Sequence, residues 1–243
     1  MLSLPPRFAA LACAPVALLL LACPVEVVDD ESADIEEVDG GDEPGTAEGE
    51  EAEETGGTDE GGPYGHGNLN PDCIGDAPVV VFETNLGTMT VELDAVRAPI
   101  TVENFLGYVS AQHYDQTVFH RVIDGFVIQG GGFDTDFNFL DTQGTIVLEI
   151  HPELRHVDGA LAMARSNDPD SAEAQWYITD GAQGGLDDNY AVFGFVTEGL
   201  ETRDAISAVP TGSKDIEIDG QVYAFEDVPV DNVVVQSMYC AAQ

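Results

Sequence analysis

The sequence predicts a mainly β domain of antiparallel strands, arranged as a barrel or a sandwich, over residues 71–243. Short runs of β-branched and aromatic residues recur along this region, and Gly, Asp, Asn and Pro clusters separate them. One stretch alone shows a strong helical period of apolar residues. The apolar content suffices for one core, and no internal repeat divides the region.

The strand predictions begin with the stretch VVVFETNLGTMTVEL, residues 79–93. Apolar and polar residues alternate on either side of Asn85-Leu86-Gly87, so we expect two strands joined by a tight turn. The later strand candidates have the same composition and lie at 117–122, 126–131, 160–165, 175–179, 191–196 and 233–238.

Two helices are expected between these strands. In residues 98–111, the apolar side chains at 102, 105, 106 and 109 recur at helical spacing behind Pro99. This helix should cover an open end of the barrel. A second helix with a poorer apolar stripe is expected to begin near Thr197 and to end before Pro210.

The N-terminal region has the features of a secretory signal over residues 1–22. Arg7 precedes a short apolar run, and Leu20-Leu21-Ala22-Cys23 resembles the bacterial lipobox, in which the cysteine receives a lipid. An uncleaved membrane anchor is the competing interpretation, but the run is short for a span of about 20 residues. We expect lipidation at Cys23 and an extracytoplasmic domain held at a bacterial membrane, in the periplasm or at the cell surface.

Residues 23–70 are predicted to be an acidic, disordered linker. The stretch 26–60 is about half Asp and Glu and contains no Lys or Arg, so it cannot bury enough apolar surface to fold. The formal net charge of the chain is -39, with 7 Lys+Arg against 46 Asp+Glu. Nucleic acid is therefore excluded as a partner, since phosphate contacts need clustered cations.

The folded region contains two cysteines, Cys73 near its start and Cys240 near its end. In an oxidising compartment, cysteines at these positions predict a disulfide that joins the first and last segments. Two unpaired thiols are the alternative.

Common catalytic patterns are absent from the sequence. It contains no G-x-S-x-G elbow, no P-loop lysine and no dinucleotide fingerprint, so no cofactor is expected. His151 and His156 are the only close pair of histidines. Metal binding by this pair is an alternative to the simpler interpretation of a surface loop.

Four blocks occur in a fixed order: FHRVIDGFVIQGGGF (119–133), GALAMARS (159–166), SAEAQWYIT (171–179) and YAVFGFV (190–196). Together with LEIHPELRHVDG (148–159), they resemble the signature of the cyclophilin family of peptidyl-prolyl cis-trans isomerases. The resemblance covers approximately residues 79–235. It implies an eight-stranded antiparallel barrel closed by two helices.

The resemblance also implies a role for individual residues. Arg121 matches the catalytic arginine of the family, and Tyr177 stands where a phenylalanine is usual, so its extra hydroxyl needs a partner or water. Gly130 to Gly132 indicate close backbone approach more than a phosphate site. The substrate-binding positions that the family would carry over are Phe126, Val127, Gln129, Ala164, Arg165, Gln175, Tyr177, Leu186 and Tyr190.

The expected function is therefore prolyl isomerisation in unfolded or flexible Pro-containing polypeptides, by a monomer. A proline-peptide binding module or holdase with little turnover is the main alternative. A structural surface lipoprotein that uses only its acidic segment is a third.

Overall fold

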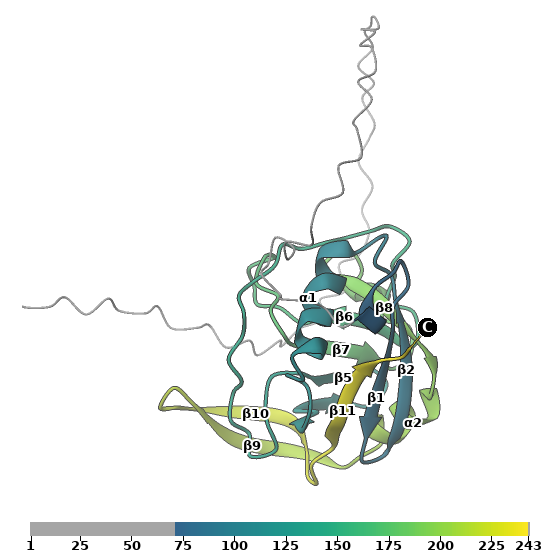
Figure 1. Ribbon diagram of the computed structural model, residues 1–243. Helices are drawn as coiled ribbons and strands as arrows, with labels where there is room; N and C mark the ends of the chain where they lie inside the picture. The colour runs from purple at the N-terminus through teal and green to yellow at the C-terminus, as the bar shows by residue number, and fades with distance from the viewer. Residues whose placement is uncertain (1–70, 243) are drawn as a thin grey trace, which may run out of the picture. The chain divides into compact units, whose positions relative to one another are not determined.

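The structure is a computed structural model that describes residues 71–242 (Figure 1). The predicted signal peptide, the acidic linker and Cys23 lie outside these residues. None of the helices between residues 71 and 242 is long and apolar enough to cross a bilayer.

Nine antiparallel strands form the main sheet, in the order β3-β11-β1-β2-β8-β6-β7-β5-β4. Each stretch predicted as a strand contributes to it. The strands are β1 (Val79–Thr84), β2 (Gly87–Leu93), β3 (Thr117–Val118), β4 (Arg121–Ile123), β5 (Val127–Gly130), β6 (Ala160–Met163), β7 (Trp176–Thr179), β8 (Val192–Glu198) and β11 (Val234–Cys240).

The two ends of this sheet meet within residues 117–123. Phe119 N donates to Val233 O, beside β11, at 3.0 Å, and His120 N donates to Gln129 O of β5 at 3.1 Å. Residues 117–123 thus act as one bent strand that pairs with β11 first and β5 afterwards. The strand count is nine, not the expected eight, because this strand is interrupted between Val118 and Arg121.

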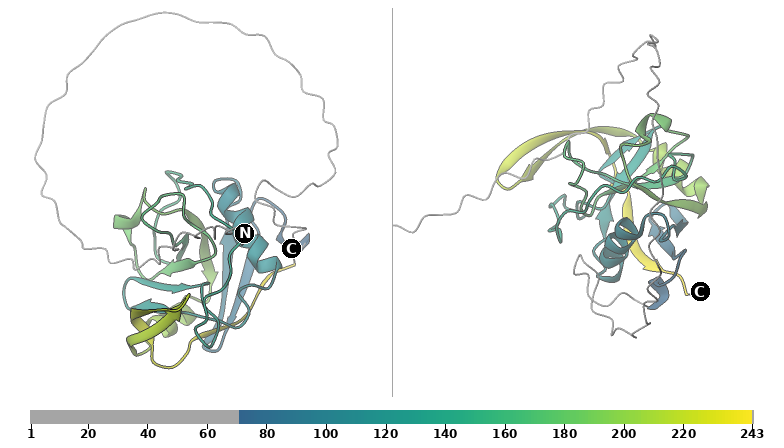
Figure 2. Two further views of the ribbon diagram at one scale, coloured as in Figure 1. Left: turned by 90° about the vertical axis from the view of Figure 1, so that its left-hand side faces the viewer. Right: turned by 90° about the horizontal axis from the view of Figure 1, so that it is seen from above.

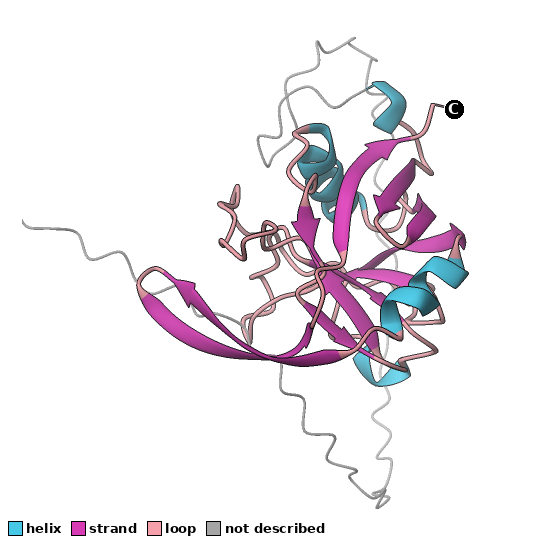
Figure 3. Cartoon of the chain, turned by 90° about the horizontal axis from the view of Figure 1, so that it is seen from below, coloured by secondary structure: helices cyan, strands magenta, loops and turns pink. Residues whose placement is uncertain are grey.

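Helix α1 (Pro99–Ser110) confirms the first predicted helix, and its apolar stripe is buried. Helix α2 (Leu200–Ser207) is shorter than predicted, because β8 continues to Glu198. Gly199 separates the two elements with a φ of 86°, and a Cβ there would collide with the Thr88 carbonyl oxygen. The strands of the sheet lie between the two helices (Figure 3).

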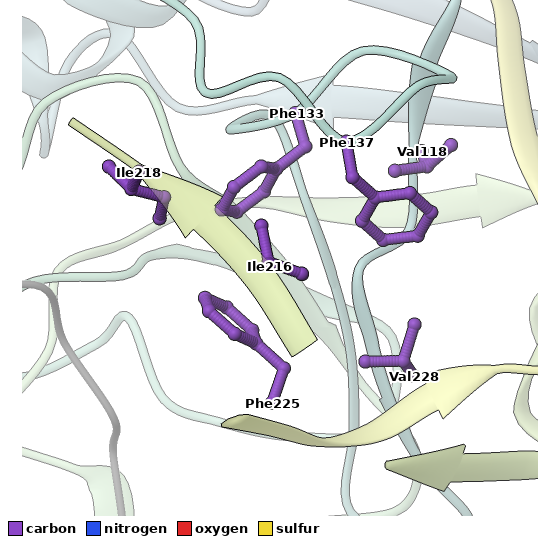
Figure 4. Packing of buried hydrophobic residues seen from close by; sticks show 7 residues of the cluster. All are labelled: Val118, Phe133, Phe137, Ile216, Ile218, Phe225 and Val228. Carbon is purple, nitrogen blue, oxygen red and sulfur yellow. The ribbon is translucent and has the colours of Figure 1, made fainter. Parts of the chain in front are cut away.

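A second sheet, which the sequence analysis did not predict, is the hairpin of β9 (Thr211–Ile218) and β10 (Gln221–Pro229). Its turn residues Asp219 and Gly220 have φ values of 52° and 77°, as a two-residue hairpin turn requires. The hairpin extends beyond the main strands (Figure 2). Its apolar face packs on the segment after β5 and on β3, through a cluster of Val118, Phe133, Phe137, Ile216, Ile218, Phe225 and Val228 (Figure 4).

Trp176 and Gln175 explain the three consecutive glycines that begin at the end of β5. The Trp176 ring is fully buried and meets Phe82 edge to face at a centroid distance of 5.2 Å. A Cβ on Gly131, whose φ is 86°, would lie 2.8 Å from the indole nitrogen of Trp176. A Cβ on Gly132 would lie 2.8 Å from the Gln175 amide carbon. The glycines therefore provide close backbone approach, as predicted.

Cys73 and Cys240 are joined by a disulfide across a sequence separation of 167 residues. Their Cα atoms lie 5.3 Å apart, and both side chains are buried. The bond connects the short helix η1 (Pro71–Cys73) to the last strand, β11.

We expect the paired substitution Cys73→Ser/Cys240→Ser to lower the free energy of unfolding by up to about 5 kcal/mol, because a closed loop of this length restricts the unfolded chain. Urea titration of wild type and variant, followed by circular dichroism, measures the change. Identical unfolding midpoints for the two proteins under non-reducing conditions would contradict it.

Candidate functional site

The register of four strands brings predicted site residues into one row. Arg121 of β4 pairs with Gln129 of β5, Gln129 pairs with Tyr177 of β7, and Tyr177 pairs with Ala162 of β6. Directly paired residues of antiparallel strands share a face, so these side chains project from the same side of the sheet. The neighbouring row points to the other side and has exposed fractions of 1% or less; it consists of Val122, Ile128, Ile178 and Leu161.

Phe126 lies in the turn between β4 and β5, and several hydrogen bonds fix that turn. Asp180 N donates to Phe126 O at 2.8 Å, and Gly125 N donates to the Asp180 carboxylate at 2.9 Å. Gln183 Nε2 donates to Gly125 O at 2.9 Å. Phe126 is half-buried, and Val127, which follows it on β5, is buried.

A cavity of about 200 Å³ lies beside this row. Gln129 and Gln175 line it and are joined by a hydrogen bond from Gln129 Nε2 to Gln175 Oε1, 3.1 Å long. Ala164 and Arg165 also line it, and Ala164 N donates to Gln175 O at 2.9 Å. Four of the predicted substrate-binding residues therefore surround one hollow.

A hydrogen bond and an aromatic contact fix the side chain of Arg165. Its Nε donates to Asn189 O at 2.9 Å, and its guanidinium carbon lies 4.7 Å from the centre of the Tyr190 ring. Such stacking contributes about 0.5 to 1 kcal/mol at an exposed site. Tyr190 in turn meets Tyr177 edge to face at 6.0 Å. Arg165 and Tyr190, two of the predicted positions, thus support Tyr177, which we call the pocket floor.

Leu186 ends the short helix η2 (Gly184–Leu186) and is buried. Its N–H donates to Gln183 O, and Gln183 also binds the turn before Phe126. Gln183 therefore fixes Leu186, which we call the far wall of the site, to the turn at Phe126, which we call its edge. A Cβ on the preceding residue, Gly185, would meet nothing within 4 Å, so space is left open there.

The Tyr177 hydroxyl has a partner that the sequence analysis did not identify. It lies 2.9 Å from Nε2 of His156, whose Nδ1 lies 2.8 Å from Asp187 Oδ1. The interpretation of the 151–156 stretch as a surface loop is wrong for His156, which is 2% exposed. No local pattern signals this contact, because its three residues come from separate segments.

His120, next to Arg121, is neutral at pH 7. Burial, together with the charge of Arg121, lowers the pKa of His120 to about 3. The histidine ring packs against Phe133 at a centroid distance of 4.9 Å. Arg121 therefore has no second cation at the adjacent position.

Comparisons with known proteins agree with this geometry. Residues 79–239 match the family model "Cyclophilin type peptidyl-prolyl cis-trans isomerase/CLD". A peptidyl-prolyl cis-trans isomerase of Streptomyces antibioticus is 44% identical over 166 residues, which is 65% of this chain and 95% of the relative. Isomerase B of Escherichia coli is 36% identical over 171 residues, which is 66% of this chain and 98% of the relative.

Solved structures give the same result. A cyclophilin-type isomerase of Cryptosporidium parvum superposes with a TM-score of 0.57 and 25% identity, covering 69% of this chain and 99% of its own. The family model covers well over half of the sequence. This chain belongs to the cyclophilin-type peptidyl-prolyl cis-trans isomerase family.

Proposed function

We propose that residues 71–243 form a monomeric prolyl isomerase that rotates X–Pro bonds in unfolded or flexible extracytoplasmic polypeptides. Arg121 is the catalytic residue. The observation that carries this assignment is the row of Arg121, Gln129 and Tyr177, in which Gln129 also lines a cavity. Relatives named as peptidyl-prolyl cis-trans isomerases support it, and a solved relative was crystallised in the presence of the dipeptide Ala-Pro.

The reaction needs a cation in a fixed position. Rotation of a peptide bond must break amide resonance, against a barrier of about 18 to 20 kcal/mol. At the twisted midpoint the proline nitrogen gains a lone pair. A charged hydrogen-bond donor at that nitrogen stabilises the transition state more than either planar form. Arginine suits this role because it stays protonated and its fork of donors is rigid.

The remaining site residues hold the substrate. Phe126, Val127 and Leu186 supply apolar surface that grips the proline ring while the carbonyl side turns. Exclusion of water at such a surface strengthens the contact with Arg121. The cavity lined by Gln129, Ala164, Arg165 and Gln175 receives the substrate backbone.

We expect Arg121→Ala to lower kcat/KM by about two to three orders of magnitude, since it removes the donor that acts in the transition state. Arg121→Lys keeps the charge without the fork and should recover part of the rate. NMR exchange spectroscopy on an X–Pro peptide measures the rate directly.

Arg97→Ala is the matched control. Arg97 is a surface arginine that bonds Asp94 and Glu153, and its loss should leave the rate unchanged. Full activity in Arg121→Ala would refute the catalytic role. Peptide binding by wild type without accelerated exchange would instead indicate a binding module or holdase.

The proposed location is a bacterial membrane surface outside the cytoplasm, reached through a lipid on Cys23. The disulfide between Cys73 and Cys240 supports an oxidising compartment. The acidic linker of residues 23–70 then separates the isomerase from the membrane.

We expect Cys23→Ser to move the protein from the membrane pellet to the soluble fraction, because the variant lacks the acceptor thiol of the lipid. Cys13→Ser is the control and should remain in the pellet, since Cys13 lies inside the signal. Cell fractionation followed by immunoblotting distinguishes the two. Retention of Cys23→Ser in the pellet would rule out lipidation at this residue.

A further inference from the structure

Three side chains connect the pocket floor to the segment after η2. Tyr177 comes from β7, His156 from the connection before β6, and Asp187 directly follows Leu186. The Tyr177 hydroxyl lies 2.9 Å from His156 Nε2, and His156 Nδ1 lies 2.8 Å from Asp187 Oδ1. The same Asp187 oxygen accepts the His156 backbone N–H at 2.8 Å.

The partners determine which nitrogen of His156 carries the proton. An ionised carboxylate only accepts hydrogen bonds, so the proton lies on Nδ1 and points at Asp187. Nε2 of the neutral ring then accepts the hydroxyl proton of Tyr177. Burial is the largest single effect on the pKa of Asp187 and raises it. The hydrogen bonds from the His156 backbone and ring, together with nearby charges, outweigh burial, so the pKa of Asp187 is lowered. Asp187 is therefore ionised at neutral pH.

The direction of the Tyr177 hydroxyl matters because the proposed site grips the proline ring through apolar surface. The tyrosine is 4% exposed and lies between Gln129 and Ala162 in the sheet register. When the hydroxyl donates to His156, its hydrogen bond lies on the side of Tyr177 away from the substrate. Loss of that acceptor would turn the hydroxyl dipole toward the site that grips the proline ring, which weakens binding.

His156 also holds the far wall. Its carbonyl oxygen accepts the Gln183 N–H at 2.7 Å, and Asp187 binds both its ring and its backbone. Leu186 lies between these two attachment points. One buried histidine is thus bonded to the floor at Tyr177 and to both ends of the segment that carries Leu186.

We propose that His156, oriented by Asp187, is a positioning residue for isomerisation that keeps the Tyr177 hydroxyl turned away from the proline ring. The inference rests on the proposed function of this site. His156 is buried behind Tyr177 and acts through its hydroxyl.

A pH dependence follows from this arrangement. The titratable and charged groups around the His156 ring are Tyr177 on β7, Asp187 after η2 and the neighbouring Arg155, which lies 3.8 Å from Asp187 and 2.9 Å from Asp188. Burial lowers the pKa of His156 below its ordinary value of 6.5, although the hydrogen bond and charge of Asp187 oppose the shift. The neutral ring therefore persists to a pH below 6.5.

Protonation would make Nε2 a donor, so it could no longer accept from Tyr177. We expect peptide affinity, and with it kcat/KM, to fall as the pH drops through the lowered pKa of His156. Arg121 stays charged across this range. The acid limb should be smaller in Tyr177→Phe, which has no hydroxyl to redirect.

The test is a double-mutant cycle on the full chain. NMR exchange spectroscopy on an X–Pro peptide measures the rate from pH 5 to pH 8, a range that brackets the ordinary histidine pKa of about 6.5. We expect His156→Ala to lower kcat/KM about tenfold, mainly through weaker peptide binding, and to have less than about a twofold effect in the Tyr177→Phe background. His151→Ala is the control: its ring accepts a hydrogen bond from Glu153 N within the same connection, and its loss should not alter the rate.

A measurement on the wild-type chain needs no substitution. Nitrogen-15 spectra of the His156 ring should show the neutral Nδ1–H form at pH 7 and a titration below pH 6.5. The Nε2–H form, or equal effects of His156→Ala with and without the Tyr177 hydroxyl, would overturn the positioning role. Absence of accelerated exchange by wild type would instead refute the proposed function, so the two failures are distinguishable.

Discussion

The backbone pairing of residues 117–123 determines where every other part of the site lies. This segment joins β11 on one side to β5 on the other, which closes the sheet and sets the register of β4. Side chains alternate with a period of two, so Arg121 faces the site while Val122 enters the core. A slip of one residue would exchange them, placing a charge in the barrel and an apolar residue in the site. The buried row beside Val122 therefore fixes the position of Arg121.

The same alternation lets β7 serve the core and the site at once. Trp176 points inward, where it meets Phe119 edge to face at 5.5 Å and fills the space left by Gly130 and Gly131. Tyr177 points outward and forms the floor. A bulkier residue at Gly131 would displace Trp176 and shift Tyr177 with it. Packing inside the barrel thus has a direct effect on the geometry of the pocket.

The sequence predicts the parts of the fold that depend on local patterns. The apolar period of α1, the Asn85-Leu86 turn and the stretch from Arg121 to Gln129 all lie within short windows. The β9–β10 hairpin also carries a local signal, since Asp219-Gly220 lies between alternating residues. The contacts of His156 had none, because Tyr177 and Asp187 lie 21 and 31 residues away. In a chain so rich in carboxylates, Asp187 does not stand out.

One buried arginine outside the site, Arg203, holds carboxylates at a point that supports the site. Arg203 of α2 is buried and lies 2.6 Å from Asp158 and 3.5 Å from Asp180. Asp180 in turn binds Gly125 N, and its own N–H binds Phe126 O. Removal of Arg203 would take away the cation that Asp158 and Asp180 share. The edge of the pocket at Phe126 therefore depends on an arginine outside the site, through a chain of contacts that begins in α2.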